Sequence, residues 1–199
     1  MTLRDEVEVI LRRTMNAFPI RWETQGFGML RTYLEGENEP RLQIWDQRLL
    51  VWEYSNIHDH PWDFTSTIVA GHLFNQRYWR MSGCYMSPAG ELSEEYNEAL
   101  IVPGPVNETA PRPQKCWLAR KPLELYGPGD QYSQTWNELH CTQYTQGTIT
   151  VIDRKRTRPD GDHASSIWKG DGPWVSARPR PATNVEVQLV VDNALRTWF

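Results

Sequence analysis

Residues 58–71 read His-Asp-His-Pro-Trp-Asp-Phe-Thr-Ser-Thr-Ile-Val-Ala-Gly, which places two histidines directly before a run of aromatic and β-branched residues. Such a run is typical of a β-strand. Side chains alternate along a strand, so His58 and His60 are expected on one face, about 7 Å apart. The two histidines are therefore predicted to lie on a β-scaffold, beside a bend at Pro61.

A third histidine follows a similar pattern further along the chain. Residues 126–130 (Tyr-Gly-Pro-Gly-Asp) predict a tight turn, and Asn137 belongs to a second turn just before His140 opens another strand. Imidazole binds Zn, Fe, Mn and Ni, with the nitrogen about 2.1 Å from the ion. We therefore predict that His58, His60 and His140 bind one divalent ion, which is Fe, Mn, Ni or Zn.

The first of these motifs resembles that of the cupin superfamily, in which a His-x-His pair is followed by a glutamate and, seven residues later, a glycine. Gly71 stands in register with that glycine, whereas Phe64 occupies the position of the glutamate. The longer stretch His-Asp-His-Pro-Trp-Asp-Phe is similar to a group of poorly characterised cupin-like proteins from bacteria and their phages. This resemblance covers roughly residues 25–155.

The second cupin motif contains a glycine, then a proline-x-glycine turn, then a lone histidine. Gly129, Thr135, Asn137 and His140 have the corresponding spacing. Thr135 replaces the proline, and Asn137 replaces the glycine, an exchange that a left-handed turn position accepts. All three motif histidines are thus matched, and the glutamate is not.

The resemblance implies a mainly β fold, the double-stranded β-helix of a cupin or jelly-roll barrel. Short strands separated by Gly, Pro and Asn turns agree with it. We expect a single cupin-like domain, 1–199, with a lead-in at 1–24, the barrel at 25–155 and a C-terminal wrap at 156–199. Thr2 is expected to cap a helix from Leu3 to Asn16 outside the barrel.

Other segments carry weaker structural signals. Residues 81–114 contain several Gly and Pro turns and predict an insertion with a strand only near 99–102. The Pro-, Gly- and Asp-rich segment 157–181 is expected to wrap the barrel or close its mouth. Alternation along 185–191 predicts one last strand, followed by a short helical turn at 193–199.

The fourth metal ligand stays open, because the glutamate is missing. Three neutral imidazoles leave both positive charges of the ion uncompensated. In this respect the motif resembles that of three-histidine thiol dioxygenases and some other cupins. Asp63 would replace the glutamate only if the strand bulges, since alternation sends its side chain to the other face. Ligating histidines usually donate their second N–H to an acceptor, for which Asp63, Asp59 and Glu138 are the candidates. The alternative is a metal-free barrel whose histidines only form hydrogen bonds.

The expected ligand is a small molecule, because aromatic residues surround the histidines in the sequence. The candidates are Trp62, Phe64, Trp136 and Tyr144. A cation beside aromatic walls favours a small anionic or polyhydroxylated molecule. The basic run at 154–158 has two readings, a solvated strand end or a site for a phosphate or carboxylate.

Two classes of function remain open. The first is a metal-dependent dioxygenase, isomerase or hydrolase that acts on a small polar metabolite. The second is a noncatalytic protein with a degenerate site, which binds a sugar or nucleotide-like ligand or takes part in an assembly. The sequence does not decide whether the chain is an enzyme, and it leaves a homodimer open.

Composition narrows the partners. The chain has 199 residues, of which 39% are hydrophobic, enough for one globular domain. A net charge of −4 argues against general nucleic-acid binding. No apolar run approaches 18 residues, so no membrane span is expected. A charged N-terminus and three widely spaced cysteines favour the cytoplasm.

Overall fold

The computed structural model describes residues 2–16, 20–34, 40–51, 57–101, 113–157, 164–170 and 179–199. The described chain is mainly β, a double-stranded β-helix of the jelly-roll type with an N-terminal helix, so the predicted fold class is confirmed. Neither helix in these ranges is long and apolar enough to cross a membrane.

The first sheet contains seven strands, and every pair of neighbours is antiparallel. These strands are β1 (Glu23–Gln25), β2 (Phe27–Tyr33), β3 (Arg41–Leu50), β5 (Trp62–Ala70), β10 (Gln131–Gln134), β12 (Ile149–Thr157) and β14 (Arg180–Pro181). Their order in the sheet is β10-β5-β12-β3-β2-β1-β14. The central strands come from distant parts of the chain, so long-range pairing holds this sheet together.

The second sheet also contains seven antiparallel strands. They are β4 (Ile57–His58), β6 (Leu73–Met81), β7 (Glu94–Ile101), β8 (Gln114–Arg120), β9 (Glu124–Tyr126), β11 (His140–Tyr144) and β13 (Ala164–Trp168). Their order is β11-β4-β13-β7-β8-β6-β9, and β11 pairs with β6 as well as with β4. This extra pairing closes β11, β4, β13, β7, β8 and β6 into a ring.

Tight corners carry the chain from one sheet to the other. Gly71 and His72 join β5 of the first sheet to β6 of the second, and Gly71 has a φ of 77°. A side chain at Gly71 would also meet the backbone of Thr148. Only glycine adopts this left-handed conformation without strain, which explains why the segment 58–71 ends in glycine.

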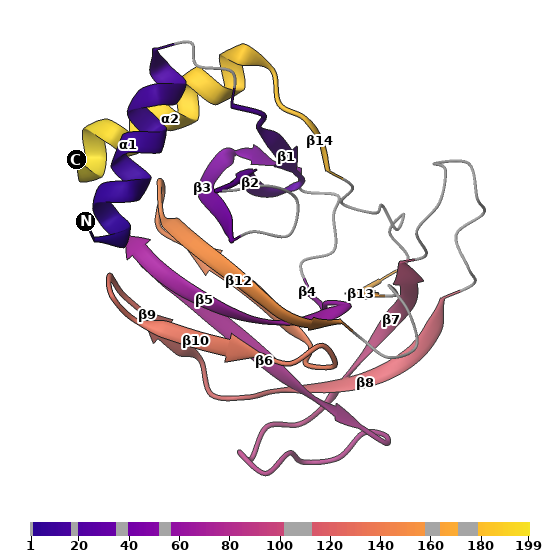
Figure 1. The fold of residues 1–199 in the computed structure, drawn as a ribbon. Helices are drawn as coiled ribbons and strands as arrows, with labels where there is room; N and C mark the ends of the chain where they lie inside the picture. The colour runs from indigo at the N-terminus through magenta and orange to yellow at the C-terminus, as the bar shows by residue number, and fades with distance from the viewer. Residues whose placement is uncertain are drawn as a thin grey trace.

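Two helices cover the outer face of the first sheet. Helix α1 (Leu3–Met15) and helix α2 (Asn184–Trp198) lie side by side, close to the two ends of the chain (Figure 1). Val7 and Leu11 of α1 and Val191 of α2 join one buried cluster with Leu42 and Ile44 of β3. The predicted N-terminal helix is confirmed, and its Thr2 cap forms a capping box with Asp5.

The predicted strand at 185–191 is wrong, because these residues belong to α2. Thr183 and Glu186 form a capping box that starts the helix. Val187, Val190 and Ala194 follow at helical spacing and face the cluster described above. The alternation of apolar residues in 185–191 spans only seven residues and does not reflect a strand, whereas the capping box marks the start of the helix.

The segment expected to be mostly irregular forms more strand than predicted. Strand β7 begins at Glu94, five residues before the predicted strand, and pairs with both β8 and β13. Its sequence is polar, so it shows little strand signal, but hydrogen bonds on both edges hold it in the sheet. Residues 102–112 lie outside the described ranges, as do 52–56, 158–163 and 171–178.

The segment expected to wrap the barrel supplies strands to it. Strand β13 pairs with β4 and β7 inside the second sheet, and β14 pairs with β1 at the edge of the first. Between the two sheets, a second apolar cluster contains Met29, Trp45, Phe64 and Ile152 among others. This inner face of the first sheet forms one wall of the site.

Candidate functional site

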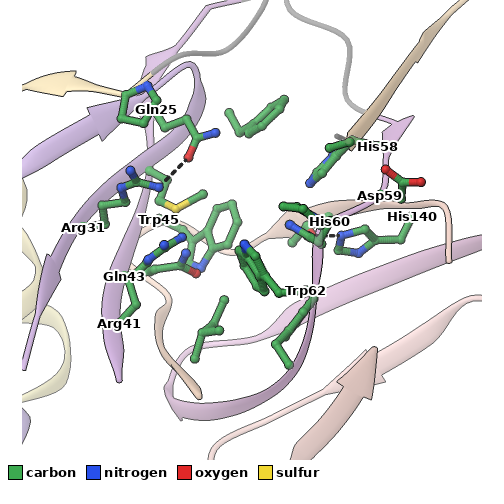
Figure 2. A pocket seen from close by; sticks show the side chains of 18 of the residues that line it. Gln25, Arg31, Arg41, Gln43, Trp45, His58, Asp59, His60, Trp62 and His140 are labelled. Atoms are coloured by element: carbon green, nitrogen blue, oxygen red, sulfur yellow. Dashed lines mark hydrogen bonds between the residues drawn. The ribbon is translucent and has the colours of Figure 1, made fainter. Parts of the chain in front are cut away.

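The three predicted histidines meet where β4 and β11 of the second sheet lie beside the bend that leads into β5 of the first. His58 and His140 are direct partners across β4 and β11, while His60 lies in the bend before β5. Their ligand nitrogens all lie within 4.8 Å of one another, and the Nε2 atoms of His60 and His140 are 3.0 Å apart (Figure 2). The predicted convergence is therefore present, although a bend at 59–61, rather than one continuous strand, directs His60 inwards.

These distances fit a metal centre. Two nitrogens that each lie about 2.1 Å from one ion are about 3.0–3.4 Å apart in octahedral or tetrahedral geometry. The separation of His60 and His140 falls in this range. The His58 ring centroid lies 4.8 Å from the centroids of both other rings, and the ligand nitrogens of the set lie up to 4.8 Å apart, so His58 has to move closer to the other two before one ion can contact all three. The donor set, three imidazoles, suits Zn, Fe, Mn or Ni.

A buried asparagine fixes the proton on His140. Asn75 of β6 is fully buried, and its Oδ1 lies 2.8 Å from Nδ1 of His140. Its Nδ2 donates to Glu124 Oε2 at 3.2 Å, which sets the orientation of the amide. The amide oxygen must then accept, so His140 donates from Nδ1 and keeps its Nε2 lone pair for the cluster. This is the arrangement that a ligating histidine requires.

The surroundings keep two of the imidazoles neutral. Burial first, then His58 and Arg41, hold the pKa of His60 well below the usual 6.5. Burial, followed by His58, His60 and Arg77, lowers the pKa of His140 in the same direction. Both rings are consequently unprotonated at pH 7, and no proton competes with a metal ion there.

Asn75 gives the first testable prediction. Asn75→Ala removes the acceptor that fixes the His140 ring, so we expect metal affinity to fall by about 10–100-fold, the usual effect of losing such a support. The control is Asn97→Ala, which removes another buried strand asparagine whose Nδ2 donates to Gly170 O instead. Chelator competition measures both affinities. Equal affinity of the Asn75 variant and the wild type would contradict this role.

The histidines open onto a cavity of about 280 Å³ between the two sheets. Its walls are mostly apolar, from residues of β2, β3, β5 and β12. His58 stacks on Phe27, with ring centroids 4.7 Å apart and planes 6° apart. Pockets that bind small molecules usually range from about 300 to 1,000 Å³, so this one suits a small metabolite.

Two of the four predicted aromatic residues line this cavity. The Trp62 ring lies 4.6 Å from the His60 ring, and the Phe64 ring meets the same imidazole edge-on at 5.0 Å. Phe64, at the position of the cupin glutamate, is buried beside the histidines and has no ligating atom. The cluster of ligating groups in the described chain accordingly contains the three histidines and no carboxylate.

The other two predicted aromatic residues do not line the cavity. The backbone N–H of Trp136 donates to Asp63 Oδ1 at 2.8 Å, which holds the turn before β11. Tyr144 packs behind Trp45, with ring centroids 5.0 Å apart, and its hydroxyl donates to Phe27 O at 3.4 Å. Proximity in sequence to a histidine therefore did not place either residue among those that line the cavity: Trp136 lies in the turn before β11, and Tyr144 packs against Trp45.

The carboxylates proposed as ligand or support serve other partners. Asp63 is engaged with Trp136, so its side chain follows the strand alternation and does not bulge towards the histidines. Asp59 is buried, and its Oδ1 accepts from Ser165 N. Glu138 pairs with Arg77 and Lys121. For His140 the supporting acceptor is Asn75 instead.

The polar wall opposite the histidines was missed in the sequence. Figure 2 shows Arg31, Arg41 and Gln43 there, from β2 and β3. Leu42 and Ile44 alternate with the polar residues of β3. Such alternation usually means that the apolar side chains face the core and the polar side chains face solvent. Because the two helices cover Leu42 and Ile44, the alternate face of β3 points into the barrel, and its polar residues are buried with it.

The basic run at 154–158 is not a segment that follows the strand: residues 154–157 belong to β12, and Arg158 lies outside the described residues. The guanidinium carbon of Arg154 lies 5.8 Å from the centroid of the Trp62 ring, so this residue approaches the rim of the site. Of the cysteines, Cys141 is buried and contacts Tyr78, as expected for a small core residue.

No protein-family model matches this chain, and no curated protein matches it either. The function therefore has to be argued from the site itself.

Proposed function

We propose that the chain is a cupin-like protein in which His58, His60 and His140 hold one divalent ion, and that it acts on a small polar metabolite. The single observation that carries this proposal is the convergence of three ligand nitrogens within 4.8 Å at one end of a cavity. The two motif registers described above, which resemble those of cupins, support the same reading.

The residues around the histidines would assist such a centre in distinct ways. A bound ion would polarise a carbonyl group or activate water or oxygen. Asn75 holds the Nε2 lone pair of His140 towards the cluster. Trp62 and Phe64 pack on His60 and exclude water from one side of it, which strengthens electrostatic interactions in the cavity.

A second candidate is a noncatalytic binding protein with the same cavity. The observation that favours it is the contact of 3.0 Å between His60 Nε2 and His140 Nε2, which also suits a hydrogen bond between two neutral imidazoles. In that case Nε2 of His60 donates its proton to the lone pair of His140. The two candidates differ in one property, the affinity for metal.

Metal content separates them. Purified protein would be treated with a chelator, dialysed and loaded in turn with Zn²⁺, Mn²⁺, Ni²⁺ and, without oxygen, Fe²⁺. Elemental analysis after a second dialysis should find close to one ion per chain for at least one of these metals. Protein that retains none of the four at neutral pH would favour the noncatalytic binding protein and contradict the metal centre.

A further inference from the structure

We propose that Arg41 forms an anion-binding subsite opposite the three histidines, so that the cavity takes a small metabolite with a carboxylate or phosphate group. This inference names the ligand class of the same cavity and rests on the proposed function in that respect. The acidic group would contact Arg41, and the rest of the molecule would extend towards the histidines.

The first argument is that Arg41 is buried with donors left over. Its side chain lines the cavity, and the residue is only 7% exposed. Nη2 donates to the Tyr33 hydroxyl at 3.2 Å, whereas the buried Nε has no hydrogen-bond partner among the residues that the structure describes. Among the ion pairs of the described chain, none includes Arg41. Buried polar groups are nearly always hydrogen-bonded, so an unpaired guanidinium N–H in a cavity indicates a position for an acceptor.

The neighbouring Arg31 shows the contrast. It lies one strand away and is also buried, but Glu23 accepts from its Nε and Nη2 and Gln25 accepts from its Nη1. Arg31 is therefore neutralised by protein groups. Arg41 lies on the same wall, and its hydrogen-bond partner in the described part of the chain is the hydroxyl of Tyr33, which carries no charge to balance the guanidinium.

The charges around Arg41 favour an anion. Burial, followed by the positive charge of Arg31, lowers the pKa of Arg41 to about 10, so the guanidinium remains charged at pH 7. A buried cation without a carboxylate partner is costly, and a bound anion offsets this cost. A guanidinium also presents two parallel N–H groups that match the oxygens of a carboxylate or phosphate.

The aromatic wall connects this subsite to the metal centre. The guanidinium carbon of Arg41 lies 5.3 Å from the centroid of the Trp62 ring, and the centroid of the His60 ring lies 4.6 Å from the same indole. Trp62 thus contacts both polar ends of the cavity. A ligand of a few carbons could lie along Trp62 with its anion on Arg41 and a further oxygen at the histidines, and the cavity volume of about 280 Å³ allows little more.

Calorimetric titration tests the subsite with two acids, glutarate and glycerol 3-phosphate, and with glutaramide as an uncharged molecule of the glutarate skeleton. Each is titrated into chelator-treated protein and into zinc-loaded protein. We expect at least one acid to bind both forms of the protein, and glutaramide to bind at least 10-fold more weakly. Arg41→Gln should lower the affinity for the acid at least 10-fold. Which acid binds tighter distinguishes carboxylate from phosphate.

Two further variants complete the test. Arg196→Gln makes the same charge change on an exposed helix position and should leave acid binding unchanged. Arg41→Lys keeps the positive charge but lacks the planar pair of N–H groups, so it should also lower the affinity for the acid. This variant provides the test if Arg41→Gln does not fold. Binding of neither acid to either form, or equal acid binding by the Arg41 variants, would overturn the subsite. Acid binding through Arg41 in a protein that takes up no metal would overturn the metal centre alone.

Discussion

Replacing His60 by alanine is expected to lower the affinity for a divalent ion by at least about 100-fold. The change leaves His58 and His140 as the ligands, and two imidazoles hold an ion poorly against solvent. Even the loss of a group that only orients a ligand costs about 10–100-fold, so the loss of a ligand should cost more. Competition with a chromogenic chelator at pH 7.5 measures the affinity.

An exposed histidine supplies the matched control. His72 lies at the corner between β5 and β6 and outside the cluster of ligand nitrogens, so His72→Ala should bind metal as the wild type does. Melting temperatures of both variants show whether they are folded. Stoichiometric metal retained by folded His60→Ala protein would show that the ligand assignment is wrong.

The largest effect on stability is expected from Val191→Asp. Val191 of α2 is 0% exposed and packs in the cluster between the helices and the first sheet. A carboxylate there has no partner for its charge, and an unpaired buried charge costs about 3–5 kcal/mol. For a chain of this size we expect the melting temperature to fall by roughly 10 °C. Thermal unfolding followed by circular dichroism measures it.

Val185→Asp tests the helix against the strand that the sequence suggested. In a strand, Val185 and Val191 would share a face, and both substitutions would have similar effects. In a helix they lie about 120° apart, and Val185 is 73% exposed in the first turn, where a negative charge is favourable. We expect this variant to unfold within a few degrees of the wild type. Equal losses in both variants would contradict the helix.

Local signals account for what could be predicted from the sequence. The strand that follows His60 is rich in β-branched residues, and the two turns before His140 are marked by Gly, Pro and Asn, so both histidine motifs could be placed on a β-scaffold. The cap at Thr2 likewise gave the first helix. Thr183 and Glu186 carry a similar capping pattern, which is the local signal in the sequence that indicates α2.

Long-range pairing accounts for what could not be predicted. Asn75 reaches His140 because β6 pairs with β11, and nothing in the sequence gives that register. A weak signal existed, since Asn75 shares a strand face with the buried Leu73 and a polar residue in such a position needs a partner. Arg41 gave no comparable signal, because its burial follows from helices that cover the opposite face of β3.

The central claim is that three histidines from β4, the following bend and β11 hold a single ion. Crystals of the zinc-loaded protein, measured on both sides of the zinc absorption edge, test it most directly. The account predicts one strong anomalous peak about 2.1 Å from the Nε2 atoms of His60 and His140 and from one ring nitrogen of His58. Zinc-loaded crystals without a peak between these rings, or with zinc bound by other residues, would contradict the account.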